Sequence, residues 1–352
     1  MNPLRVLVVD DQSFMRLALR RIIEADGDML VVGQARNGLE AVSLAQSLRP
    51  DAVTMDVEMP GMSGLDACAL ILRTVSPPPA VIMVSAFTQS GAEATTRALH
   101  LGAVDFVSKS SLHLPTDLAQ IDSELRTKLR AWSKGPEGSE LLEPAAPIRA
   151  VPPAEQRRAP DLIVIAVSTG GPRTLTTLLT ALGPVAPPIA IALHMPEFFT
   201  ASFALMLAQD TGCLVREGAH RLHLAPGTVT LLPGGRDSVV GPRAGGGWDL
   251  RIVKIESSVH PSADALFESA ALVVPKPVGI VLTGMGTDGA RGVRALSRKG
   301  APVLVQNPRS CIVGGMPEAA IAACPDCEIL TVEQIARRLA EWTSRPAALG
   351  PV

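Results

Sequence analysis

The chain has 352 residues, of which 47% are hydrophobic and 19% are charged, and its formal net charge at pH 7 is −2. This length favours two domains, and a composition with 30 Gly and 30 Pro residues is that of a loop-rich α/β protein rather than a disordered or fibrous one. A near-neutral charge without a Lys/Arg block argues against binding to nucleic acid. No apolar stretch is long enough to cross a membrane, and the first residues lack the features of a signal peptide, so we expect a cytoplasmic protein without membrane insertion.

Apolar runs alternate with helical patterns in the first part of the chain. Segments 14–25 and 37–48 carry apolar residues at helical spacing, and a further helix is expected over about 117–132. Parallel strands need crossover helices of this kind, so residues 1–125 are predicted to form a doubly wound, parallel-sheet α/β domain. The expected strands are 6–9, 30–33, 52–55, 80–84 and 104–107.

The alternation stops after residue 133 and resumes near residue 161. The intervening segment is rich in Pro, Ala, Glu and Arg, a composition that predicts an extended linker without a core of its own. We therefore assign residues 1–125 to the first domain, 126–160 to a Pro-rich linker and 161–348 to a second domain.

The second domain is also predicted to be a doubly wound, Rossmann-like parallel sheet. Its expected strands are 162–167, 189–193, 278–283 and 301–305. Region 218–253 is less regular, and its short β-like runs at 228–232 and 250–253 predict a β-hairpin inserted into this domain.

Charged and hydroxyl side chains end four strands of the first predicted sheet: Asp10 and Asp11, Asp56, Ser85, and Lys109. Ligands of open parallel sheets bind at the carboxyl ends of the strands. Carboxylates gathered there suit Mg²⁺, and a lysine beside the metal would offset charge on a phosphoryl group transferred to the central carboxylate. Taken singly, paired Asp residues can be helix N-caps and a lysine is usually solvated, but their common edge favours a site.

The motifs VLVVDDQSFMR, MDVEMPGMSGLD, MVSA and DFVSK resemble the receiver domain of two-component response regulators over residues 1 to about 125. The resemblance implies a flavodoxin-like fold in which Asp56 accepts a phosphoryl group from a histidine kinase. It implies as Mg²⁺ ligands Asp10, Asp11, Asp56 and the carbonyl of Glu58. It also implies that Ser85 and Lys109 contact the phosphoryl group and that Phe106 occupies the aromatic switch position.

A hydroxyl, an imidazole and a carboxylate follow strands of the second predicted sheet. Ser168 ends strand 162–167 and precedes a Gly-Gly-Pro helix start, whose free N–H groups can stabilise negative charge. His194 follows the next strand, and Asp288 follows strand 278–283. Such a set is what acyl transfer requires. Each residue alone has a plainer interpretation, as an N-cap, a structural histidine or a turn former.

The segment GMGTDG, residues 284–289, also matches the GxGxxG fingerprint of dinucleotide-binding domains. A nicotinamide site favours an acidic residue about twenty positions later, and no Asp or Glu occurs between Gly289 and Glu318. Arg309 could instead bind a 2′-phosphate, so a nucleotide-dependent oxidoreductase remains an alternative.

The five cysteines do not make a disulfide framework. Cys324 and Cys327 have CxxC spacing, but no second pair of metal ligands follows them, so two reduced thiols are favoured over a zinc site or a thioredoxin-like motif.

The segments AVSTGGPRTL, LHMPEFFTASFA, SVHPSADALFESAA, LTGMGTDGARGV and VQNPRSCIVGGMPEAA resemble the catalytic domain of chemotaxis protein-glutamate methylesterases, the CheB family. The resemblance implies a nucleophile, a general base and an orienting carboxylate at Ser168, His194 and Asp288. It places Thr169 and Met285 in the oxyanion region and implies no cofactor for the esterase reaction. Leu193 and segment 231–237, LLPGGRD, depart from the family's usual Gln and APGGxH, and these departures concern the substrate groove more than the three reactive residues.

This resemblance implies a monomer that hydrolyses glutamate methyl esters on chemoreceptors, releases methanol and restores glutamate, and also deamidates receptor glutamines. It implies further that the unphosphorylated receiver inhibits the reaction and that phosphorylation at Asp56 activates it. A response regulator whose output domain only binds a partner is the second class of function that the sequence leaves open.

Overall fold

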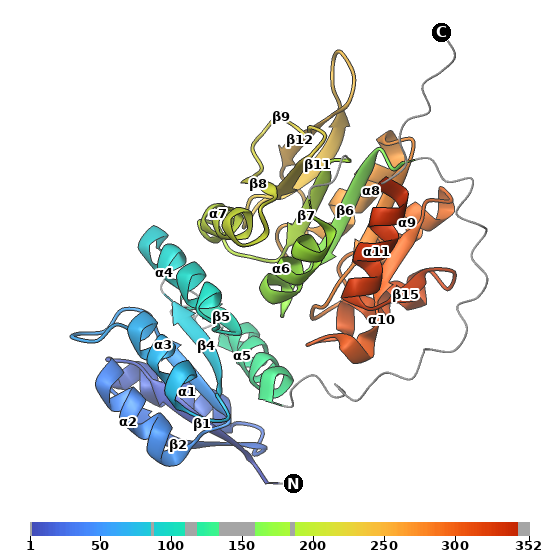
Figure 1. The fold of residues 1–352 in the computed structure, drawn as a ribbon. Helices are drawn as coiled ribbons and strands as arrows, with labels where there is room; N and C mark the ends of the chain where they lie inside the picture. Colours follow the sequence, from blue (N-terminus) through green and yellow to red (C-terminus); the bar gives the residue numbers. More distant parts are fainter. Residues whose placement is uncertain (1, 86–87, 110–117, 134–158, 184–186, 344–352) are drawn as a thin grey trace. The chain divides into compact units, whose positions relative to one another are not determined.

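The structure is a computed structural model that describes residues 2–85, 88–109, 118–133, 159–183 and 187–343 (Figure 1). The chain divides into two compact units, Met1–Gly135 and Pro136–Val352, and each is described here by itself. Among the described helices, none is both long and apolar enough to span a bilayer.

The first unit is a five-stranded parallel sheet in the order β2-β1-β3-β4-β5, which confirms the predicted flavodoxin-like topology. Its strands are β1 (Leu4–Val9), β2 (Met29–Ala35), β3 (Ala52–Asp56), β4 (Ala80–Ser85) and β5 (Asp105–Ser108). Its helices are α1 (Ser13–Glu24), α2 (Gly38–Leu48), α3 (Gly64–Thr74), α4 (Gln89–His100) and α5 (Leu118–Ser133).

Helix α5 extends further than the predicted domain boundary at residue 125. Residues 126–133 are helical, which confirms the helix expected over about 117–132, although the domain assignment counted them with the linker. Leu125, Leu129 and Trp132 recur at helical spacing and are buried, so the packing of this face keeps the helix going beyond the boundary. Most of the predicted Pro-rich linker, residues 134–158, lies outside the described residues.

The second unit contains a seven-stranded parallel sheet in the order β15-β14-β13-β6-β7-β10-β8. The strands in chain order are β6 (Leu162–Val167), β7 (Ile189–Leu193), β8 (Leu214–Glu217), β10 (Thr228–Leu231), β13 (Pro277–Val281), β14 (Val303–Gln306) and β15 (Glu328–Leu330). The α-helices are α6 (Gly171–Leu182), α7 (Phe199–Thr211), α8 (Ala263–Val273), α9 (Ala290–Arg298), α10 (Gly315–Ala323) and α11 (Val332–Thr343), and a short 3₁₀ helix, η3, spans Pro308–Ser310.

A separate antiparallel sheet contains the predicted hairpin, with the expected strand at 250–253 but a different partner strand. It consists of β11 (Asp237–Pro242), β12 (Trp248–Val253) and the short β9 (Leu222–His223), in the order β11-β12-β9. The run at 228–232 was expected in the hairpin, and instead β10 pairs in parallel with β7 and β8 in the main sheet. All four residues of β10 are buried, which suits an interior strand of the main sheet.

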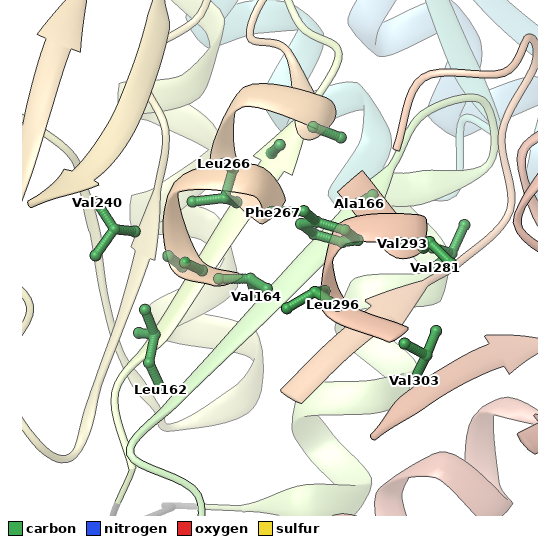
Figure 2. Close-up of a cluster of buried hydrophobic side chains, with 14 of the residues drawn as sticks. Leu162, Val164, Ala166, Val240, Leu266, Phe267, Val281, Val293, Leu296 and Val303 are labelled. Atoms are coloured by element: carbon green, nitrogen blue, oxygen red, sulfur yellow. The ribbon is translucent and has the colours of Figure 1, made fainter. Parts of the chain in front are cut away.

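A hydrophobic core packs helices α8 and α9 against the main sheet (Figure 2). Phe267 and Leu296 from these helices lie beside Val164 and Ala166 of β6, and all four side chains are fully buried. Because this packing holds α8 in place, the first residues of the helix lie next to Asp288, at the carboxyl ends of the strands of the main sheet.

Candidate functional sites

Three loops at the carboxyl ends of neighbouring strands carry Ser168, His194 and Asp288. The central strand β6 pairs with β7 so that Val167 lies opposite Leu193, and Ser168 and His194 therefore leave adjacent strands at the same level. On the other side of β6, the Ser168 N–H donates to the carbonyl of Thr283, just after β13. The topology therefore brings the three sequence-predicted residues to one edge of the sheet.

His194 and Asp288 form a direct pair. The ring nitrogen Nε2 of His194 lies 2.8 Å from Oδ2 of Asp288, and the two side chains are only 12% and 9% exposed. Burial on its own raises the pKa of Asp288, but the hydrogen bond and charge of His194, together with backbone N–H groups, outweigh burial and hold the pKa below its ordinary value. Asp288 is therefore ionised at neutral pH.

The beginning of helix α8 supplies further donors to the Asp288 carboxylate. The Ala263 N–H donates to Oδ2 at 2.6 Å, and the Asp264 N–H donates to Oδ1 at 3.0 Å. The Ser262 hydroxyl also donates to Oδ1 at 3.3 Å. A helix N-terminus favours negative charge, so both carboxylate oxygens are fixed and stabilised.

Ser168 is half-buried beside this pair. In the part of the chain that the structure describes, its hydroxyl makes no hydrogen bond to His194. Because Nε2 of His194 faces Asp288, the nitrogen left for a second partner is Nδ1. Hydrogen bonds between a nucleophile and its base are often long without substrate and tighten when substrate binds.

Glycines allow the surrounding loops to approach Ser168 closely. A Cβ atom on Gly284 would lie 2.8 Å from the Cβ of Ser168 and 2.3 Å from the sulfur of Met316. A Cβ atom on Gly171 would lie 2.8 Å from a methyl group of Val167. Gly170, with φ of 78°, adopts the left-handed conformation that starts helix α6. The glycines at 171 and 284 are thus required at this edge because a side chain at either position would clash with its neighbours.

The two residues expected in the oxyanion region directly follow Ser168 and Gly284 in the chain. Thr169 is buried, and its carbonyl accepts a hydrogen bond from the Thr283 hydroxyl at 3.0 Å. Met285 follows Gly284 and is 36% exposed. The first turn of α6 begins at Gly171, so backbone N–H groups lie next to the serine in sequence.

Sequence reasoning missed the groups that hold Asp288. Ser262 accepts a hydrogen bond from the Ala265 N–H and is the N-cap of α8. A serine ahead of an apolar run is an N-cap signal, so the helix start could have been found from the sequence. The Asp237–His260 contact, in which Nδ1 of His260 lies 2.8 Å from Oδ2 of Asp237, was also missed.

The first unit brings together Asp10, Asp56 and Lys109. The Lys109 ammonium lies 2.9 Å from an oxygen of Asp10 and 2.8 Å from an oxygen of Asp56, and all three side chains are buried. Burial raises the pKa of Asp56 to about 6, in spite of the hydrogen bond and charge of Lys109, which lower it. Burial alone lowers the pKa of Lys109, but the two carboxylates outweigh burial and raise it.

The acidic residues of this site fit a divalent cation. Carboxylate oxygens of Asp10, Asp11 and Asp56 lie within 4.8 Å of one another. Among the described residues, no other group of His, Cys, Asp or Glu side chains is arranged in this way. Hard oxygen donors at this spacing suit Mg²⁺. Glu58 lies beside them, because its backbone N–H hydrogen-bonds Asp56, while its side chain accepts a hydrogen bond from Ser90 at 3.3 Å.

The expected switch residues also lie at this edge. Ser85 ends β4, is fully buried and lies opposite Ser108 of β5. Phe106 is buried within β5, with the ammonium of Lys128 at 5.3 Å from the centre of its ring. Lys128 also donates to the Phe106 carbonyl and pairs with Asp105 at 3.0 Å.

The CxxC cysteines have the properties of ordinary buried thiols. Cys324 and Cys327 are both free. Burial raises the pKa of the Cys327 thiol to about 12, so it is protonated at neutral pH. Within the described residues, neither belongs to a group of side chains that could hold a metal ion.

Comparison with known proteins shows similarity in both units. A family model described as CheB methylesterase matches residues 163–339, and one described as response regulator receiver domain matches residues 6–119. The chain is 39% identical over 345 residues to protein-glutamate methylesterase/protein-glutamine glutaminase 1 of Cupriavidus metallidurans, covering 96% of this chain and 95% of that protein. It is 41% identical over 323 residues to the protein of the same name from Caulobacter vibrioides, covering 91% of this chain and 92% of that one. The crystal structure of the Thermotoga maritima CheB methylesterase catalytic domain is 29% identical, with a TM-score of 0.50, and the match covers 52% of this chain and 98% of that one.

Proposed function

This chain belongs to the CheB methylesterase family, and we propose that it hydrolyses γ-glutamyl methyl esters on chemoreceptors, releasing methanol and restoring glutamate. The observation that carries the proposal is the His194–Asp288 pair at 2.8 Å, held beside Ser168 at one edge of the sheet. A base oriented by a carboxylate next to a hydroxyl is the arrangement that acyl transfer requires.

In the proposed reaction, the Ser168 oxygen attacks the ester carbonyl while Nδ1 of His194 takes the hydroxyl proton. The Nε2–H of His194 stays bonded to ionised Asp288, which stabilises the imidazolium as it forms. The imidazolium then protonates methoxide, so methanol leaves and an acyl-serine remains. Water, deprotonated by His194, attacks the acyl-serine and returns free serine and the glutamate carboxylate.

The oxyanion of each tetrahedral intermediate needs donors next to Ser168. We assign this role to the region around Thr169 and Met285, because Thr169 precedes the first turn of α6 and Met285 follows the glycine that packs on the serine. Backbone N–H groups at such a turn are oriented toward the oxyanion position before negative charge develops there. None of these steps calls on a cofactor.

Glutamine deamidation is a second reaction of the same site. An amide carbonyl attacked by Ser168 gives the same acyl-serine, with ammonia leaving in place of methanol. The curated relatives carry the name protein-glutamine glutaminase as well as protein-glutamate methylesterase, which supports this extension.

Phosphorylation of the receiver is proposed to control the esterase. Asp56 is the acceptor for a phosphoryl group from a histidine kinase, and Ser85 and Lys109 contact that group, with Phe106 responding at the switch position. Mg²⁺, held by Asp10, Asp11, Asp56 and the Glu58 carbonyl, offsets the negative charge of the phosphoryl group when bound.

We further assign the protein to the cytoplasm, as a monomer that acts on receptors without entering the membrane and without binding nucleic acid. The near-neutral charge balance supports the part of this assignment that concerns nucleic acid. Neither matching family model is that of a nucleotide-dependent oxidoreductase, which removes support from that interpretation of GMGTDG.

Methanol release from membranes that contain methylated chemoreceptors tests the proposal. The wild-type protein should release methanol, and faster with a phosphoryl donor and Mg²⁺, whereas Ser168→Ala should release none although it remains folded. An output domain that only binds would release no methanol even as the wild type, and that result would overturn the proposed function.

A further inference from the structure

A second buried carboxylate, Asp237, lies behind the groups that hold Asp288. Asp237 begins β11 and is 3% exposed, and its two oxygens have separate partners. Oδ1 accepts a hydrogen bond from the Ser262 N–H at 2.8 Å, and Oδ2 lies 2.8 Å from Nδ1 of His260. We propose that Asp237 is a positioning residue for the esterase reaction, which fixes segment 260–262 and through it the Asp288 carboxylate. The inference rests on the proposed function.

Ser262 connects the two carboxylates. Its backbone N–H is bonded to Asp237, while its hydroxyl and the next two backbone N–H groups donate to Asp288. Ser262 is itself buried and caps helix α8. Because one residue contacts both carboxylates, a displacement of Ser262 moves three of the donors that orient Asp288 toward His194.

The loop that carries Asp237 also supports the chain next to His194. The Gly235 N–H donates to the Met195 carbonyl at 3.1 Å, and the Gly234 N–H donates to the Thr200 hydroxyl at 2.9 Å. A Cβ atom on Gly234 would lie 2.2 Å from the Pro196 carbonyl, so the two loops are in close backbone contact. The loop at 234–237 thus contacts both the chain that follows His194 and the segment that binds Asp288.

The groups that face position 237 suit a side chain with acceptor oxygens. This position lies in segment 231–237, where the chain departs from the APGGxH pattern of the family that it resembles, and Asp237 stands at the place of the histidine. A neutral imidazole has a single acceptor nitrogen, so it could not accept hydrogen bonds from both the Ser262 N–H and an N–H of His260. An ionised carboxylate does both, and these bonds offset part of the cost of burying its charge.

The two partners of Asp237 differ in importance. The Ser262 N–H is buried and leads directly to Asp288, whereas the His260 side chain is 40% exposed, so water screens its pairing with Asp237. We therefore expect the bond to Ser262 to carry most of the positioning effect.

The test compares kcat and KM for methanol release by full-length variants. Asp237→Ala should lower kcat about 10- to 100-fold with KM within about twofold of wild type, because a small displacement of the reacting groups is costly while the Asp237 side chain itself is buried. Asp237→Asn should recover most of this loss, since its amide oxygen still accepts from Ser262. His260→Ala should fall between the wild type and Asp237→Ala. Arg243→Ala is the matched control, because it removes an exposed ion pair with Asp249 at the end of the β11–β12 hairpin remote from Asp237 and should leave kcat within about twofold of wild type.

A spectroscopic readout separates this inference from the proposed function. An imidazole N–H bonded to an ionised carboxylate gives a downfield proton NMR resonance, which His194 should show in the wild type and in Ser168→Ala. Asp237→Ala should broaden or shift this resonance, also in a protein that releases no methanol. If methanol release is absent but the resonance responds to Asp237→Ala, the proposed function fails and the positioning inference stands.

A folded Asp237→Ala protein with wild-type kcat and an unchanged resonance would overturn the inference, as would a loss confined to KM. Should Asp237→Ala not fold, Asp237→Ser applies the same test, because its hydroxyl keeps the site polar but is too short to bond Ser262 directly.

Discussion

The His194 ring and the Asp288 carboxylate meet at 2.8 Å although 94 residues separate them in the sequence. Every oxygen of this carboxylate already receives donors, from His194 and Ala263 on one side and from Asp264 and Ser262 on the other. A side chain at position 288 that donates a hydrogen bond would therefore face another donor.

Replacing Asp288 by Asn should lower both kcat and stability. Whichever way the amide turns, its NH₂ group faces a backbone N–H or the His194 Nε2–H, so we expect a loss of about 1–3 kcal/mol in unfolding free energy. The wrong tautomer of His194 is then favoured, and kcat should fall roughly 10³- to 10⁴-fold. Steady-state methanol release and thermal unfolding measure the two effects. Glu268→Gln, which weakens an exposed pair with Arg291 on the same helix α8, should change neither, and an Asp288→Asn protein of near-normal kcat would contradict the role of the pair.

The buried carboxylate of Asp56, the proposed phosphoryl acceptor, should make the receiver less stable above pH 6. Because burial raises its pKa to about 6, the folded state holds this proton more tightly than the unfolded chain does, and the resulting stabilisation is lost as the pH rises from about 4 to about 6. Asp56→Asn should remove this pH dependence and raise the unfolding free energy at pH 7 by roughly 1–3 kcal/mol. Urea unfolding followed by the fluorescence of Trp132, in proteins that carry Trp248→Phe and Trp342→Phe so that only the first unit is observed, checks this, with Mg²⁺ expected to offset the loss in the protein that keeps Asp56. Parallel pH profiles for the two proteins would contradict it.

Gly284→Ala should disturb the nucleophile directly. The added methyl group would meet the Met316 sulfur at 2.3 Å and the Ser168 Cβ at 2.8 Å, so we expect kcat to fall at least about tenfold and the unfolding free energy by about 1–3 kcal/mol. Gly300→Ala is the control, since φ there is 74° but nothing lies within 4 Å of the new Cβ. It should cost about 1 kcal/mol from backbone strain and leave kcat unchanged. Equal effects of the two substitutions on kcat would argue against the close packing at Ser168.

Lys128→Met should destabilise the receiver strongly. Lys128 is buried against Asp105, and its removal leaves that carboxylate buried without its cation, which costs about 3–5 kcal/mol. The double variant Lys128→Met with Asp105→Asn should recover part of the loss, because no buried charge remains. Trp132 lies next to Asp105, so its fluorescence reports unfolding of this unit. A loss below about 1 kcal/mol for the single variant would show that water reaches Asp105.

All five strands of the first sheet were predicted, whereas in the main sheet of the second unit the edge strands were missed. Strands β6 and β7 have the predicted bounds, because each is a continuous apolar run that ends at a polar side chain. The short edge strands β8 and β15 were not predicted, since they bury few of their side chains and give a weak pattern. Strand β10 was assigned to the wrong sheet, because Thr-Val-Thr-Leu fits a hairpin as well as a buried strand until its neighbours are known.

The candidate sites show the same division. Ser168, His194, Asp56 and Lys109 were singled out because each ends or directly follows a strand, and parallel strands end at a common edge. Asp237 and His260 were not found, since their contact depends on the antiparallel sheet and on the start of α8 rather than on a local pattern. Long-range hydrogen bonds of this kind have no signature in a single sequence.

The strand that leads to Ser168 is the middle one of seven, and all six of its residues are inaccessible to solvent. Local fraying begins at the margins of a sheet, where amide hydrogens exchange with water through small openings. We expect the amides of β6 to exchange only when the entire unit unfolds, so warming should loosen β8 and β15 while turnover persists. The reaction centre would then be lost together with the fold, in a single cooperative step.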